Sequence, residues 1–97
     1  MSEESRSTLI TGASRGIGRA IAFRLAAMGH RIAVNYNTHP EDAEEVVESI
    51  KSKGGEAIAV QGNVADREQV DAMFSAAEEA FGPVQILVNN AGIIDDA

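Results

Sequence analysis

The sequence predicts an α/β fold in which helices cover both faces of a single parallel sheet. Short runs of β-forming residues alternate with segments of helical apolar spacing, and glycine or proline residues separate them. Each strand–helix–strand unit requires parallel pairing, because its helix must carry the chain back across the sheet. Right-handed crossovers then give a doubly wound sheet. With the strands numbered along the chain, we expect the order 3-2-1-4 and a ligand-binding crevice between the first and fourth strands.

The first strand and helix are expected near the beginning of the chain. The segment STLIT, residues 7–11, is rich in β-forming residues and is ended by Gly12. The helix begins at Gly16 and is stopped by Gly29, because glycine is typical of helix C-termini. Its apolar residues at helical spacing are Ile17, Ala20, Ile21 and Leu25.

The second strand and helix follow the same plan. The segment RIAVNY, residues 31–36, is the strand. Pro40 suits the first turn of the helix, and acidic residues follow it at the positive end. Gly54 and Gly55 end this helix. The stripe expected to be buried consists of Ala43, Val46, Val47 and Ile50.

Two further strands complete the sheet. They are EAIAVQ, residues 56–61, and VQILVNN, residues 84–90. Between them, Asp66 and Gln69 resemble a capping box at the start of a helix that ends at Gly82. The continuous apolar runs of the first and fourth strands are typical of strands covered on both faces. The apolar face of the third helix comprises Val70, Met73, Phe74, Ala77 and Phe81.

Composition and charge exclude several classes of function. A chain of 97 residues forms one domain at most, and its net charge of −7 argues against binding to nucleic acid or to an anionic membrane. Without cysteine it has no disulfide, thiolate nucleophile or cysteine-ligated metal, and its two histidines have no partner at metal-ligand spacing. No apolar stretch reaches membrane-spanning length and no secretion signal is present, so we expect a cytoplasmic location.

The segment TGASRGIG, residues 11–18, joins the first strand to the first helix. Such a turn directs free backbone N–H groups and the positive helix end at one point, where a phosphate is stabilised without a charged side chain. Glycine permits the strained turn, the close approach of a pyrophosphate and close helix–strand packing. Gly12, Gly16 and Gly18 meet these three demands, and Ser14 adds a hydroxyl donor. The strand–turn–helix context favours a nucleotide-phosphate site over a purely structural turn.

With NVAD (residues 63–66) after the third strand and NNAG (residues 89–92) at the end of the fourth, this glycine spacing resembles the amino-terminal half of the short-chain dehydrogenase/reductase family. The resemblance covers the whole chain and is strongest to the 3-oxoacyl-[acyl-carrier-protein] reductases of fatty acid biosynthesis. It implies that residues 1–97 are the dinucleotide-binding half of a Rossmann-type domain, truncated after the fourth strand. It also implies that a nicotinamide dinucleotide is bound by Gly12, Ala13, Ser14, Arg15, Gly16, Ile17 and Gly18.

The end of the second strand indicates NADP(H) as the cofactor. A dehydrogenase that prefers NAD normally has an acidic residue there, which binds the ribose hydroxyls and repels a 2′-phosphate. This chain has Asn37 and Thr38, which can donate neutral hydrogen bonds, while Arg15 can offer a planar guanidinium to a phosphate. In the family this pattern implies NADP(H). The alternative is a solvated Arg15, with Asn37 and Thr38 only capping the next helix.

The same resemblance implies two further cofactor contacts. Asn63 and Val64 should flank the adenine, with the amide oxygen of Asn63 accepting a hydrogen bond from the exocyclic amine. Asn90, Ala91 and Gly92 should lie against the ribose next to the nicotinamide. In the family the NNAG segment also ties the fourth strand to its neighbours. For Asn89 the two roles have equal weight, and for Asn90 cofactor contact is favoured.

The resemblance implies hydride transfer between NADPH and a carbonyl such as a 3-oxoacyl thioester. Family members use a serine and a Tyr-x-x-x-Lys pair for this step. The sole tyrosine here, Tyr36, is at the adenosine end and is followed four residues later by Pro40, so no catalytic residue is assigned. We expect part of a longer oxidoreductase whose full-length form is a homo-oligomer. The alternative is a complete stand-alone module without catalysis, which binds a nucleotide or self-associates. In the isolated chain the fourth strand is expected to be an open edge, which predicts self-association through it.

Overall fold

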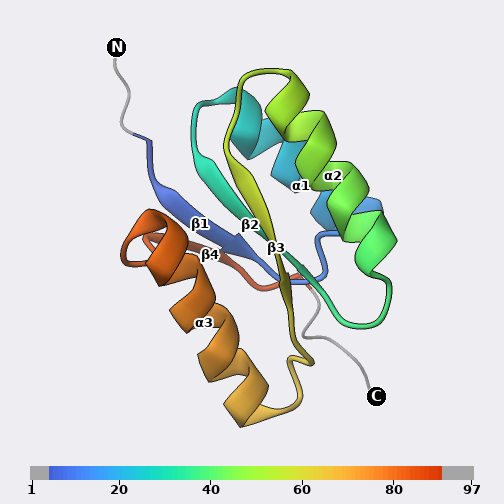
Figure 1. Ribbon diagram of the computed structural model, residues 1–97, viewed down its shortest axis with the longest axis vertical. Coiled ribbons are helices and arrows are strands. Elements are labelled where there is room, and N and C mark those ends of the chain that lie inside the picture. Colours follow the sequence, from blue (N-terminus) through green and yellow to red (C-terminus); the bar gives the residue numbers. More distant parts are fainter. Residues whose placement is uncertain (1–4, 91–97) are drawn as a thin grey trace.

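The computed structural model describes residues 5–90, in which three helices and four strands alternate along the chain (Figure 1). All strand pairs are parallel, and the strand order is β3-β2-β1-β4. The predicted fold class and strand order are therefore confirmed. The elements are β1 (Ser7–Ile10), α1 (Gly16–Ala27), β2 (Arg31–Tyr36), α2 (Pro40–Ser52), β3 (Ala57–Gln61), α3 (Arg67–Phe81) and β4 (Ile86–Val88).

Helices cover both faces of the sheet. Helices α1 and α2 lie together on one face, and α3 lies on the other (Figure 1). Successive side chains of a strand point to opposite faces, so Ile10 of β1 packs in the core under α1 and α2, whereas Leu9 packs in the core under α3. Every residue of β1 is buried, as its continuous apolar run predicts.

The predicted apolar stripe of α2 is buried along its length. Of the apolar residues predicted at helical spacing in α1, Ile17 and Ala20 are exposed, and Ile21 and Leu25 are half-buried. Ile17 is 73% exposed and does not face the core. The first turn of α1 packs against the loop between β1 and α1 through Gly18, which is buried. Because neighbouring helical residues differ by about 100° in direction, Ile17 is left facing outward.

Strand β4 is shorter and more exposed than predicted. It spans Ile86–Val88, within the predicted residues 84–90, and pairs with β1. Leu87 is 51% exposed and the other two residues are half-buried. The prediction that this strand is covered on both faces is therefore wrong for the described part of the chain. The cause is the position of β4 at the edge of the sheet, because an apolar sequence does not ensure that other elements pack on both faces of an edge strand.

The start of α3 confirms the predicted cap and modifies it. Asp66 Oδ1 accepts hydrogen bonds from the backbone N–H groups of Glu68 at 3.0 Å and Gln69 at 3.3 Å. The side chain of Gln69 does not return to the N–H of Asp66, as in a capping box. Its Oε1 instead accepts from the N–H of Asn63 at 2.8 Å, while its Nε2 donates to Asp66 Oδ2 at 3.1 Å. The helix start is thereby bonded to the loop that follows β3.

Removal of this cap should lower stability measurably. In the Asp66→Ala variant two N–H groups of α3 lose their acceptor, and we expect a loss of about 1 kcal/mol in the free energy of unfolding. For a domain of this size that loss corresponds to a fall in melting temperature of about 4–8 °C, measurable by circular dichroism. An unchanged melting temperature would show that solvent replaces the cap without cost.

Candidate functional site

The loop between β1 and α1 is bonded to the strands on both sides of β1. The backbone N–H of Thr11 donates to Val88 O of β4 at 3.0 Å. On the other side, the N–H of Ala13 donates to Asn35 O at 3.0 Å, and the N–H of Gly12 donates to Asn35 Oδ1 at 2.9 Å. The loop therefore lies where the carboxyl ends of three strands meet, which is the position of ligand sites in doubly wound sheets.

The N-terminus of α1 is electrostatically unlike those of the other helices. Its N-cap residue, Arg15, makes no side-chain cap, and its first turn contains no acidic residue. By contrast, α2 has Glu41 and Asp42 in its first turn, and Asp66 caps α3. The first N–H groups of a helix have no intrahelical acceptor, and together they carry a partial positive charge. This end of α1 is therefore suited to an anion supplied from outside the described chain.

Two glycines shape the surface at this helix end. A Cβ added to Gly18 would overlap the carbonyl oxygen of Gly12 and would lie 2.7 Å from Asn90 Nδ2, so only glycine lets the helix approach the loop this closely. Gly16 has a φ of 60°, in the left-handed region, and a Cβ there would meet nothing within 4 Å. The backbone at position 16 consequently borders open space, into which a ligand can approach closely.

A cavity of about 360 Å³ lies beside this loop, between the carboxyl ends of β2 and β3. It brings together seven of the residues predicted to bind the cofactor, drawn from three loops that are distant in sequence. None of the described residues lining it is acidic. The lining residues are Gly12, Ser14, Arg15, Asn35, Tyr36, Asn37, Thr38, His39, Gly62, Asn63 and Val64.

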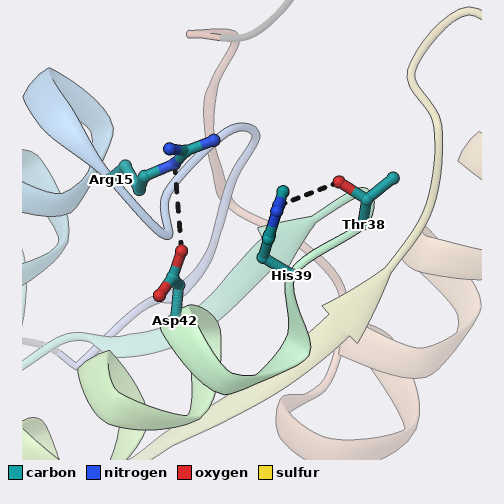
Figure 2. A network of polar contacts seen from close by, with 4 residues as sticks. All are labelled: Arg15, Thr38, His39 and Asp42. Carbon is teal, nitrogen blue, oxygen red and sulfur yellow. Dashed lines mark hydrogen bonds and ion pairs between the residues drawn. The ribbon is translucent and has the colours of Figure 1, made fainter.

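Figure 2 shows the polar side chains where the glycine loop meets the start of α2. Arg15 Nε lies 3.9 Å from Asp42 Oδ2, and the two side chains are 71% and 36% exposed. A contact this long and solvated is weak, so it does not commit the guanidinium. Beside it, Thr38 Oγ1 and His39 Nδ1 are 2.9 Å apart. Arg15 thus borders the cavity with its charge available to a further anion.

The loop after β3 is preorganised by its own hydrogen bonds. Asn63 Oδ1 accepts from the N–H of Ala65 at 2.8 Å, so one lone pair of the oxygen predicted to face adenine is already in use. Its second lone pair is the one that an adenine amine would need. Val64 lies beside Asn63 in the cavity wall and also packs against the core under α3.

At the end of β4 the two asparagines hold the glycine loop in place. Asn89 Oδ1 accepts from Thr11 Oγ1 at 3.3 Å. The N–H of Asn90 donates to Thr11 Oγ1 at 2.9 Å, and its Nδ2 donates to Gly12 O at 3.1 Å. Both residues thus have the tying role considered for this segment. Ala91 and Gly92 lie outside the described residues.

Sequence reasoning missed two residues of this site. His39 received no role, yet it lines the cavity and bonds to Thr38. Asn35 is predicted only as part of the strand segment RIAVNY, although its side chain and backbone both hold the glycine loop. The available signal was an asparagine inside the apolar segment RIAVNY, because asparagine is depleted in strands unless its amide is used.

A larger cavity, of about 430 Å³, lies at the opposite edge of the sheet. Its walls include Ala27, Gly29 and Lys53, at the C-terminal ends of α1 and α2. Among the described residues, its lining includes Arg31 and Lys53 but no helix N-terminus, and the helix ends that border it carry a partial negative charge. We therefore place the candidate site at the cavity beside the glycine loop.

The described residues show neither a metal centre nor a membrane span. Among residues 5–90, no group of three or more histidine, aspartate or glutamate side chains could hold a metal ion. Within the same range, none of the helices has the length and apolar character needed to cross a bilayer.

Comparisons with known proteins agree with this fold and glycine loop. The family model described as short chain dehydrogenase matches residues 6–97. A 3-oxoacyl-[acyl-carrier-protein] reductase of Staphylococcus aureus is 53% identical over 92 residues, which cover 95% of this chain and 37% of the relative. An NADPH-dependent aldehyde reductase-like protein of Arabidopsis thaliana, described as chloroplastic, is 52% identical over 93% of this chain and 37% of the relative.

A solved structure shows the same arrangement in space. The crystal structure of a dehydrogenase/reductase from Sinorhizobium meliloti superimposes with a TM-score of 0.87 and 41% identity, over 97% of this chain and 38% of that chain. The chain thus spans little more than a third of the length of the proteins it matches. Because the family model covers nearly the whole sequence, the chain belongs to the short-chain dehydrogenase/reductase family of oxidoreductases.

Proposed function

We propose that the chain is the NADP(H)-binding part of a short-chain oxidoreductase. The observation that carries this proposal is the N-terminus of α1, which has neither a side-chain cap nor an acidic residue and opens at the carboxyl edge of the sheet. Family membership makes a nicotinamide dinucleotide the natural anionic ligand. A diphosphate would be stabilised there by backbone N–H groups and by the helix dipole.

Each part of the dinucleotide has a set of candidate contacts. The diphosphate would be bound by the N–H groups of Gly16, Ile17 and Gly18 and by the hydroxyl of Ser14. Gly12 and Ala13 would shape the cradle without donating, because their N–H groups already donate to Asn35. The remaining assignments are Arg15, Asn37 and Thr38 for the 2′-phosphate, Asn63 and Val64 for the adenine, and Asn90, Ala91 and Gly92 for the nicotinamide ribose.

NADP(H) is favoured over NAD(H) by the charges around the cavity. No acidic residue lines it among the described residues, and Arg15 does. The 2′-phosphate of NADP(H) would therefore meet the positive charge of Arg15 at the rim of the cavity. The ribose of NAD(H), with two free hydroxyls, would lack its usual carboxylate partner. The name of the Arabidopsis relative, which specifies NADPH, points the same way.

For the whole protein we propose hydride transfer between NADPH and a carbonyl, such as the 3-oxoacyl thioester named for the Staphylococcus relative. The nicotinamide supplies or accepts the hydride, and the residues of this chain bind and orient the cofactor. No residue of this sequence is assigned a catalytic role. A place in fatty acid biosynthesis, a cytoplasmic location and a homo-oligomeric full-length form are proposals on the same ground.

Titration of the chain with NADPH and with NADH tests the proposal. We expect NADPH to bind with a dissociation constant lower by about tenfold, which corresponds to one charge-assisted contact. Nicotinamide fluorescence or calorimetry gives both constants. If neither dinucleotide binds, the assigned site is wrong; if both bind equally well, the choice of NADP(H) is wrong.

The exposed edge at β4 predicts self-association of the chain of 97 residues. In the described part of the chain β4 lies at the sheet edge with Leu87 half-exposed, so its outer backbone groups can pair with a second copy. We expect sedimentation to show dimers or larger species whose proportion rises with concentration. A Leu87→Lys variant should shift the population towards monomer, because a charge at the edge opposes strand pairing. A monodisperse wild-type monomer that binds NADPH tightly would favour the stand-alone module instead.

A further inference from the structure

Asn35 is a buried polar side chain whose amide is bonded on both sides. It lies in β2, is 2% exposed, and belongs to a strand whose other central residues are apolar. Its Oδ1 accepts from the N–H of Gly12 at 2.9 Å. Its Nδ2 donates to Gly62 O at 3.1 Å and to Val60 O at 3.3 Å. Nδ2 also lies 2.8 Å from Met73 Sδ and 3.2 Å from Tyr36 O.

These bonds connect two opposite walls of the 360 Å³ cavity. One wall is the glycine loop, which Asn35 holds through the N–H of Gly12 and, by its own carbonyl, through the N–H of Ala13. The other wall is the segment Gly62–Val64, which begins where the amide nitrogen binds Gly62 O. A single planar amide therefore fixes the separation between the candidate diphosphate and adenine contacts.

We propose that Asn35 is a positioning residue for the dinucleotide, which sets the distance between the glycine loop and the Gly62–Val64 segment. This inference rests on the proposed function, because it concerns the affinity of the same site. Because both ends of its buried amide are bonded within the protein, we assign Asn35 a positioning role and assign no ligand contact to its side chain.

Only an amide has the chemistry that this position requires. It supplies an acceptor for an N–H group and a donor for carbonyl oxygens within one short side chain. Aspartate would turn an oxygen towards Gly62 O and Val60 O, so both carbonyls would lose the amide donor and face another acceptor. Leucine would match the size but would leave the N–H of Gly12 unpaired as well, and unpaired buried polar groups are costly.

The effect reaches the phosphate cradle through direct contacts. Gly12, held by Asn35 Oδ1, presents its carbonyl to Asn90 Nδ2 at 3.1 Å and is the surface against which Gly18 packs. A shift of Gly12 would thus move the first turn of α1 relative to the adenine wall. We therefore expect variants at position 35 to weaken a ligand that spans both walls.

The test compares NADP⁺ affinity in Asn35→Asp, Asn35→Leu and a control, Thr8→Val, on the full chain. Thr8 is also buried in the sheet and donates a single bond, to Arg6 O at 3.1 Å, away from the cavity. Both Asn35 variants should bind NADP⁺ about tenfold or more weakly at temperatures where they are folded. Thr8→Val should lower the melting temperature and leave the dissociation constant unchanged.

A pH series separates positioning from a general loss of stability. Burial raises the pKa of a carboxyl group, and its protonated form regains one donor. As pH falls from 8 to 5, the ratio of the Asn35→Asp dissociation constant to the wild-type constant should therefore fall towards one. Dividing by the wild-type dissociation constant at each pH removes the contribution from titration of the 2′-phosphate of NADP⁺, which is common to both proteins. This series also decides the matter if Asn35→Leu does not fold.

Two results would overturn the inference. One is that the folded Asn35 variants bind NADP⁺ as tightly as wild type. The other is that they lose no more affinity than Thr8→Val does, and that the ratio of the Asn35→Asp to the wild-type dissociation constant does not change with pH. Failure of the proposed function is distinguishable, because then the wild-type chain itself would bind no dinucleotide.

Discussion

Substitution of Gly18 by alanine is expected to destabilise the protein and to disrupt dinucleotide binding together. The added Cβ would overlap Gly12 O and would lie 2.7 Å from Asn90 Nδ2 and 3.0 Å from Ala13 Cα. These are mostly backbone atoms held by hydrogen bonds, so the helix must move away from the loop. We expect a loss of about 1–3 kcal/mol in the free energy of unfolding and an NADPH affinity at least about tenfold weaker.

A glycine elsewhere provides the control for this variant. Gly54 follows α2 at the far end of the sheet, has a φ of 89°, and a Cβ there would meet nothing within 4 Å. Gly54→Ala should lower stability by about 1 kcal/mol through backbone strain and should leave NADPH affinity unchanged. Urea unfolding and NADPH titration measure both quantities. Wild-type affinity in Gly18→Ala would show that close packing of α1 on the loop is not needed for binding.

The second large effect is expected on cofactor choice. Among the described residues, Arg15 is the one arginine or lysine that lines the cavity. In Arg15→Ala the dissociation constant for NADPH should rise about tenfold, because a charge-assisted contact to the 2′-phosphate is lost. The constant for NADH should hardly change, since NADH has no phosphate there. Parallel titrations of wild type and variant give the discrimination ratio.

Asp42 offers a matched control, because it shares the ion pair but carries the opposite charge. Asp42→Asn breaks the 3.9 Å contact with Arg15 and keeps the guanidinium. If the pair only orients Arg15 weakly, removal of the carboxylate should leave NADPH affinity equal or slightly higher. Equal losses of affinity for both dinucleotides in Arg15→Ala would instead assign Arg15 to the diphosphate or to the loop structure.

The sequence carried enough information to predict the sheet and its strand order. The periodic stripe of α2, the cap at Asp66 and the glycine stops are local signals, and parallel crossovers leave few ways to connect such elements. The solvent exposure of single residues was harder to predict, because it depends on which elements pack beside them in space. Leu87 belongs to an apolar run yet lies at a sheet edge, and Ile17 fits the α1 stripe yet lies one position from the packed Gly18.

Residues of the candidate site could be predicted where a sequence motif marks them, but not where their role depends on contacts with residues distant in sequence. Residues 11–18 and the segment after β2 have recognisable patterns, and the structure brings Gly12, Ser14 and Arg15 of the first to one cavity with residues 37–39 of the second. The bonds made by Asn35 depend on Gly12 and Gly62, which are 23 and 27 residues away, so no local pattern reveals them. The engagement of Asn63 Oδ1 by Ala65 is a turn geometry that the motif alone did not specify.

Amide chemical shifts on addition of NADPH test the central claim most directly. If the diphosphate is bound by the N-terminus of α1, the backbone N–H signals of Gly16, Ile17 and Gly18 should shift the most, with those of Asn63 and Val64 moving as well. Inorganic pyrophosphate should shift the first three alone. Shifts concentrated around Phe23 and Lys53 at the other cavity, or no shifts at saturating NADPH, would contradict this account.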